Sequence, residues 1–165
     1  MRRKQVTEWI VAKNNPPSVI YAAQTAIGAV ASYLIAGLFR LPEAYWAPMS
    51  TLIVVQTTLN AALPISAQHF AGTAMGAGVG ALTAVFFGKN VWSFGIAVLV
   101  TGLLCALFGI ERSAYRYASI TLVIVMLVSR SNSAQLVAIH RFFEVSIGIL
   151  VGLLLFVVWP LSSKD

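Results

Sequence analysis

Apolar stretches of about the length of a membrane span recur along this chain, and they constrain its fold more than any other feature. They cover residues 19–39, 44–59, 68–87, 91–109, 114–129 and 142–159. A helix needs about 20 apolar residues to cross a hydrocarbon layer roughly 30 Å thick. Only 10% of the 165 residues are charged, against about 25% in an ordinary soluble domain. We therefore predict an all-α integral membrane protein with six transmembrane helices.

Polar segments divide the chain into three predicted parts. Residues 1–18 combine basic and apolar positions at a spacing that predicts a short amphipathic cytoplasmic helix in the headgroup region. Residues 19–160 form the six-helix domain, in which residues 60–66 and 130–141 are expected to be polar or proline-containing connections. Residues 161–165 are a cytoplasmic tail.

The basic residues predict the orientation. Seven Lys and Arg residues fall on the side of the N-terminus and four on the opposite side, so the positive-inside rule places both termini in the cytoplasm. We expect a multi-pass protein of the plasma (inner) membrane, whose surroundings are the lipid bilayer. The net charge of +6 therefore reflects membrane topology and does not indicate nucleic acid as a partner.

The composition argues against several kinds of chemistry. Cys105 is the only cysteine, so the chain can form no internal disulfide or cysteine-based metal cluster. We find no nucleophile and base pair, no zinc-binding histidine motif and no phosphate-cradling loop. The sequence therefore predicts no enzyme activity, no catalytic residue, no metal and no cofactor.

The two halves of the chain resemble each other. Three spans in each half would make the second half (residues 89–160) inverted in the membrane relative to the first (residues 19–88), as in many secondary transporters. Chance similarity between apolar helices is the alternative. The matching pairs are Tyr45/Tyr115, Thr51/Thr121, Leu52/Leu122 and Val55/Val125 at an offset of 70, and His69/Arg141, Gly76/Gly148 and Gly80/Gly152 at an offset of 72.

Glycines recur at intervals of four residues in two of the predicted spans. Gly72, Gly76 and Gly80 lie in one span, and Gly148 and Gly152 in another. Such strips allow close approach of a second helix. We predict helix packing here, either within the chain or between subunits.

Three segments carry a resemblance to a known family. Residues 45–51 are Tyr-Trp-Ala-Pro-Met-Ser-Thr, residues 69–78 are His-Phe-Ala-Gly-Thr-Ala-Met-Gly-Ala-Gly, and Arg-Phe-Phe-Glu at 141–144 is followed by Ile-Gly. These segments resemble the fusaric acid resistance and aromatic acid exporter group, over residues 21–160. The resemblance implies a six-helix module that moves organic anions, typically aromatic carboxylates outward, and also a likeness to plant malate channels.

The chain departs from that group in two respects. Where the group commonly has an arginine before the Gly-Thr motif, this sequence has His69. Many exporters of the group also carry a second membrane half and a cytosolic domain. A complete transporter built from this chain would therefore need self-association or a partner membrane subunit.

Ionisable residues within the spans are the candidate site residues, because a charge at the bilayer centre costs at least about 2.5 kcal/mol. Arg116 either faces a central cavity and attracts carboxylates or anchors its helix at the interface. Arg141 and Glu144 are three residues apart on one helix face. They form either a structural ion pair or an outer anion site in which Glu144 accepts a proton.

Further candidates are aromatic or titrate near neutral pH. His69 is either a titrating group at the cytoplasmic mouth or an interfacial residue that caps or packs. Tyr45 and Tyr115 either stack on an aromatic substrate or anchor the helices at the interface. The sequence thus leaves two functions open, namely an oligomeric organic-anion exporter or channel and a non-transporting scaffold or regulatory subunit.

Overall fold

The computed structural model describes residues 18–56, 58–128 and 133–160, and all regular structure in these ranges is helical. The predicted amphipathic helix of residues 1–17 and the tail 161–165 lie outside the described residues. The elements are α2 (Val19–Leu38), α3 (Trp46–Val54), α4 (Leu59–Phe87), α5 (Val91–Leu107), α6 (Arg112–Val123), the π-helical segment η1 (Ile124–Val128) and α7 (Ala134–Val158).

Three of the described helices, α2, α4 and α7, are long and apolar enough to cross a membrane. Helix α5 is apolar but has 17 residues. Helix α3 has only nine residues, which at 1.5 Å per residue cover about 14 Å. The prediction of a continuous span over residues 44–59 is therefore wrong. The helix ends at Val54, the backbone of Val55 is already extended, and Thr58 caps the start of the next helix.

Two of the predicted connections are also wrong, because hydroxyl caps start the helices earlier than the polar pattern indicated. Thr58 Oγ1 accepts from the amide of Ala61 at 3.3 Å, so residues 60–66 form the first turns of α4. Pro64 is tolerated there at the loss of one backbone hydrogen bond. Ser133 Oγ accepts from the amide of Leu136 at 3.4 Å, and α7 begins at Ala134. A capping hydroxyl satisfies an otherwise unpaired amide at the helix start.

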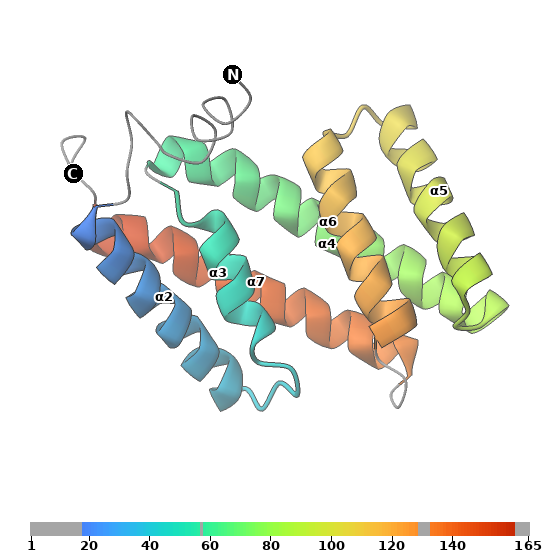
Figure 1. The fold of residues 1–165 in the computed structure, drawn as a ribbon, viewed down its shortest axis with the longest axis horizontal. Helices are drawn as coiled ribbons and strands as arrows, with labels where there is room; N and C mark the ends of the chain where they lie inside the picture. Colours follow the sequence, from blue (N-terminus) through green and yellow to red (C-terminus); the bar gives the residue numbers. More distant parts are fainter. Residues whose placement is uncertain (1–17, 57, 129–132, 161–165) are drawn as a thin grey trace, which may run out of the picture.

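The long helices α4 and α7 run side by side through the molecule, and the remaining helices pack against them (Figure 1). Helices α2 and α3 pack together and against α7. Helices α5 and α6 pack together and against α4. Helices α2 and α3 of the first half thus pack on α7 of the second half, and α5 and α6 of the second half pack on α4 of the first half.

The beginning of α2 and the end of α7 lie side by side. The amide of Gln24 donates from Nε2 to the carbonyls of Leu155 at 3.3 Å and Trp159 at 2.9 Å. The described chain therefore starts and ends on the same side of the fold. An even number of crossings, as the sequence predicts, has the same consequence.

Both glycine strips are internal packing surfaces. A Cβ on Gly72 or Gly76 would collide with the backbone of Ala114 or Ala118 in α6. On Gly148 it would collide with the backbone of Ala47 in α3. The absence of side chains lets each long helix approach a short helix closely.

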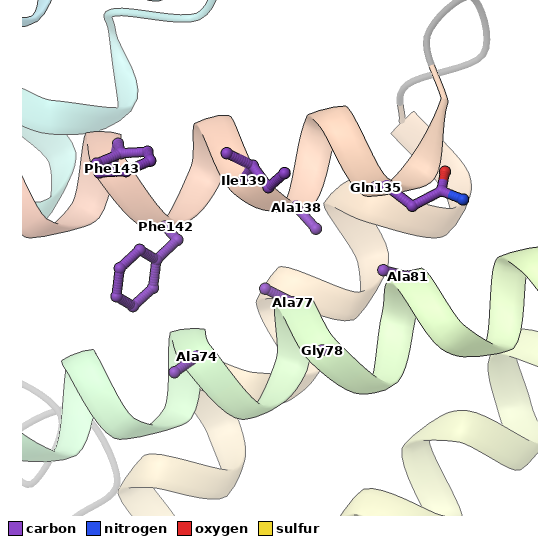
Figure 2. Close-up of a pocket in the computed structure, with 9 residues that line it drawn as sticks. All are labelled: Ala74, Ala77, Gly78, Ala81, Gln135, Ala138, Ile139, Phe142 and Phe143. Carbon is purple, nitrogen blue, oxygen red and sulfur yellow. The ribbon is translucent and has the colours of Figure 1, made fainter.

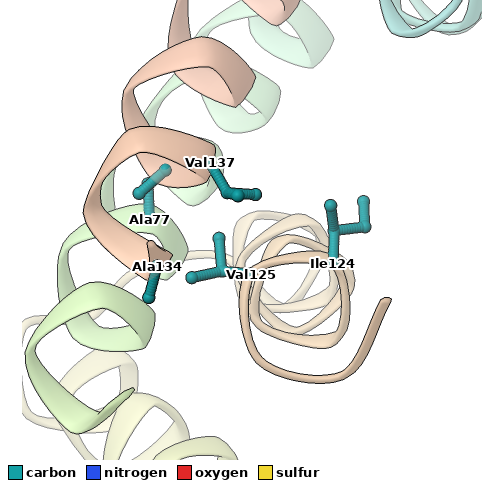
Figure 3. Packing of buried hydrophobic residues seen from close by; sticks show 6 residues of the cluster. Ala77, Ile124, Val125, Ala134 and Val137 are labelled. Atoms are coloured by element: carbon teal, nitrogen blue, oxygen red, sulfur yellow. The ribbon is translucent and has the colours of Figure 1, made fainter. Parts of the chain in front are cut away.

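An apolar cluster lies where η1 packs against α4 and the first turns of α7 (Figure 3). Because lipid tails are as apolar as these side chains, the cluster gains its stability from close packing rather than from exclusion of water. Its members are Ala77, Ile124, Val125, Ala134, Val137 and Ala138.

Candidate functional site

Ionisable side chains are buried at the centre of the fold, where α3, α4, α6 and α7 meet. Arg141 and Glu144 on α7 are 4% and 1% exposed, and His69 on α4 is 4% exposed. Arg141 lies about two turns inside α7, and His69 about three turns inside α4. Buried charge in a membrane domain is expensive and marks candidate functional residues.

Arg141 is held by an aromatic face rather than by a full set of hydrogen bonds. Its guanidinium carbon lies 3.8 Å from the ring centroid of Trp46, the first residue of α3. A cation in this position is attracted to the indole ring. Within the described part of the chain, Nε and Nη1 of Arg141 have no hydrogen-bond partner. An unsatisfied buried donor is costly. An anion that accepts hydrogen bonds from Nε and Nη1 would remove that cost.

Two carboxylates lie beside Arg141 and are connected through one turn of the chain. Glu144 Oε1 accepts from the backbone amide of Glu43 at 3.3 Å. The carboxylate of Glu43 accepts from the indole Nε1 of Trp46 at 2.8 Å. Both carboxylates act electrostatically on Arg141. Glu43 therefore contacts both neighbours of the arginine, one through its backbone and the other through its side chain.

His69 extends the polar cluster toward α6. Its Nε2 lies 3.1 Å from Ser50 Oγ, and its ring centroid lies 4.3 Å from that of Tyr117. Since the Ser50 hydroxyl donates to the carbonyl of Trp46, Nε2 is the protonated nitrogen that donates to Ser50. The remaining nitrogen, Nδ1, and the hydroxyl of Thr73 one turn further along α4 have no partner among the described groups.

A model of the family described as "Fusaric acid resistance protein-like" matches residues 28–155 of this chain, which is more than half of its 165 residues. The chain belongs to this fusaric acid resistance protein-like family. The matched range contains the whole buried cluster, from Glu43 to Glu144. No curated protein and no solved structure gives a match. Family membership and the apolar helices together indicate a membrane protein with a transport or resistance role.

The other predicted site residues of this fusaric acid resistance protein-like chain lie outside the buried cluster. Arg116 is exposed on α6. Tyr45 is 46% exposed and lies at the edge of the cluster, with its ring 5.3 Å from that of Trp46. Tyr115 packs over Gly102, and its hydroxyl donates to the carbonyl of Val98 at 3.4 Å. The structure thus brings together Arg141, Glu144 and His69, but not Arg116 or Tyr115.

Sequence reasoning missed three members of the cluster. None of these three residues, Glu43, Ser50 and Thr73, is singled out by the sequence patterns. Ser50 and Thr73 lie within the segments that carry the family resemblance, at 45–51 and 69–78, whereas Glu43 lies two residues before the first of them. The hydroxyl groups themselves give no signal, since hydroxyl residues in membrane helices usually bond to their own backbone.

Two hollows lie away from the cluster. One is an apolar groove of about 420 Å³ between α4 and α7, lined by small residues such as Ala74 and Gly78 and by Phe142, whose ring points toward α4 (Figure 2). The other, of about 450 Å³, lies at the α5–α6 connection and includes Glu111, Arg112 and Tyr115. Neither hollow is lined by Arg141 or His69.

Proposed function

We propose that this protein is a membrane exporter or channel for organic anions of the aromatic carboxylate class and that Arg141 binds the anion. The observation that carries the proposal is a buried arginine with unpartnered donors, stacked on an indole. A carboxylate accepts from guanidinium donors in charge-assisted hydrogen bonds. Trp46 and Tyr45 supply ring faces beside that position, which suits a substrate that is itself aromatic.

The proposed architecture is an inverted repeat in which α2, α3 and α4 of residues 19–88 correspond to α5, α6 and α7 of residues 89–160. Equivalent contacts in the two halves support it. Gly76 packs on Ala118 as Gly148 packs on Ala47, and Gly80 packs on Val125 as Gly152 packs on Val54. Helices α4 and α7 then correspond at an offset of 72. Helices α3 and α6 correspond at an offset of 71, one more than the offset of 70 at which identical residues match in the sequence.

The buried cluster obeys the same correspondence. His69 of α4 stacks on Tyr117 of α6, and Arg141 of α7 stacks on Trp46 of α3, so each of the two contacts joins the two halves. A basic side chain from each long helix thus meets an aromatic ring from the short helix packed against it. Transporters with inverted repeats commonly bind substrate at the interface of the repeats, and the proposed anion site combines Trp46 of the first repeat with Arg141 of the second.

Localisation and assembly complete the proposal. The protein would lie in the plasma membrane with cytoplasmic termini and would work as a homo-oligomer or with a partner membrane subunit. The glycine strips are used within the chain. The groove between α4 and α7 therefore remains as a surface for such a contact, because small residues permit close helix approach.

Uptake into proteoliposomes tests the proposed function. The purified protein is reconstituted, and entry of labelled benzoate and labelled succinate is measured with and without a pH gradient. We expect saturable uptake of benzoate that exceeds uptake by empty liposomes. Absence of flux for either anion, together with tight co-purification of another membrane protein, would contradict transport and favour the scaffold or regulatory role.

Glu144 is expected to make the flux depend on pH. Its negative charge adds to that of Glu43 and opposes the entry of a further carboxylate beside Arg141, so flux should rise as the pH falls and Glu144 becomes neutral. Glu144→Gln preserves the side-chain size and an acceptor for the Glu43 amide but cannot titrate. The variant should transport benzoate with a flat pH profile between pH 5.5 and 7.5.

Glu111→Gln is the control for the Glu144 variant. Glu111 is exposed at the start of α6 and makes no side-chain cap there. Its replacement should leave the pH profile as in the unchanged protein. A Glu144→Gln variant that retains the original profile would remove Glu144 from proton coupling.

A further inference from the structure

Glu43 adds a second negative charge to the site around Arg141. The guanidinium supplies one positive charge, and Glu43 and Glu144 supply two negative charges that both act on it. His69, the basic residue on α4, is counted as neutral, because it is only 4% exposed and its buried Nδ1 has no hydrogen-bond partner among the described groups, so a charge there would be unpaired. Tyr45 is uncharged, and Arg40 in the same turn is exposed. The site therefore carries a net charge of −1 when both carboxylates are ionised.

That count has a consequence for anion binding. An arriving carboxylate would bring the net charge of the site to −2. Water is largely excluded from Arg141 and Glu144, which are 4% and 1% exposed, so like charges repel strongly at this position. Binding one proton at Glu144, which is 1% exposed, restores neutrality before the anion enters. One proton should then accompany each monovalent anion.

The side chain of Glu43 also has a geometric role. Its carboxylate accepts from Trp46 Nε1 at 2.8 Å and so fixes the plane of the indole on which Arg141 stacks. Its backbone amide donates to Glu144 Oε1, and this contact does not depend on the side chain. Substitution at residue 43 can therefore separate the charge from the hydrogen bond to Trp46.

We propose that Glu43 is a positioning residue that sets the proton requirement of the anion site, together with Glu144, and orients Trp46 beneath Arg141. The inference rests on the proposed function, because it assumes that Arg141 binds the transported anion. It adds a residue in the turn before α3 to the site and assigns one proton to each transported monovalent anion.

Two variants of Glu43 test the inference in the reconstituted full-length protein. Glu43→Gln retains an acceptor for Trp46 but removes the charge, so its KM for benzoate should change less than twofold between pH 6.5 and 7.5. In the unchanged protein, a one-proton requirement changes the KM by up to about tenfold per pH unit. Glu43→Ala loses both roles and should also raise the KM at every pH.

A second measurement covers the case in which a variant reconstitutes poorly. Benzoate should raise the Tm of the detergent-solubilised protein more at pH 6.5 than at pH 7.5. The same rise should be independent of pH in Glu43→Gln. Glu111→Gln again serves as the control and should behave as the unchanged protein.

The outcomes separate the two proposals. Absence of benzoate flux and of benzoate-induced stabilisation in the unchanged protein overturns the proposed function itself. Flux that depends on Arg141 but keeps its full pH dependence in Glu43→Gln overturns the proton assignment alone. Equal KM values in Glu43→Ala and Glu43→Gln overturn the positioning role of the hydrogen bond to Trp46.

Discussion

Arg141→Ala is expected to reduce benzoate uptake by a factor of roughly 30 to 4,000. Truncating one partner of a buried, hydrogen-bonded charge pair costs about 2–5 kcal/mol, and about 1.4 kcal/mol corresponds to a factor of ten. The loss has two sources in this site. The anion loses the guanidinium donors, and Glu144 remains buried without its positive neighbour. The initial rate of uptake into proteoliposomes measures the effect.

Arg116→Ala is the matched control for that loss. It removes the same side chain from an exposed position on α6 and should leave the rate of uptake within a factor of two. Arg141→Lys should give an intermediate rate, because lysine keeps the charge but loses the planar stack on Trp46. Normal uptake by Arg141→Ala combined with a large loss in Arg116→Ala would move the anion site to α6.

The choice between these two arginines shows where sequence reasoning reaches its limit. Composition and apolar length predict a helical membrane protein, and the residues around Trp46 and His69 carry a family resemblance that the matching family model confirms. Which side of a helix faces the interior is a different question. In a helix that is apolar all round, the hydrophobic pattern gives little information on rotation. Arg116 and Arg141 therefore looked equivalent until the packing separated them.

Helix ends were predicted less well for a related reason. Polar composition suggested connections at residues 60–66 and 130–141, yet Thr58 and Ser133 cap helices that begin there. A single capping hydrogen bond decides such a boundary, whereas composition averages over many residues. The end of α3 could not be predicted from composition either, because the chain remains apolar after the helix ends at Val54.

The spacing of the glycines predicts packing surfaces, but the partner helices are known only from the structure. Spacing shows that a second helix can approach α4 and α7 closely. It does not show that Gly76 meets α6 or that Gly148 meets α3. The buried cluster also forms between helices of different halves, since Trp46 comes from the first half and Arg141 from the second. A site assembled from long-range contacts cannot be read from local patterns.

Gly76→Ala is expected to destabilise the fold by about 1–3 kcal/mol, the usual range for overpacking a well-packed interior. The new Cβ would lie 2.8 Å from the Cα of Ala118 and would also collide with its carbonyl oxygen. Because the obstacle is backbone, no side-chain rotation relieves the contact, and α4 must move away from α6. Thermal unfolding in detergent should show a Tm several degrees below that of the unchanged protein.

Gly78→Ala is the control on the same helix, because a Cβ at Gly78 meets no atom within 4 Å. Alanine also has the higher helix propensity, so this Tm should stay the same or rise slightly. Equal Tm values for the two variants would contradict the close α4–α6 contact.

Transport should respond more strongly than stability to Gly76→Ala. His69 and Thr73 lie on α4 within two turns of Gly76, and Tyr117 lies beside Ala118 on α6, so separating the helices pulls the His69–Tyr117 contact apart.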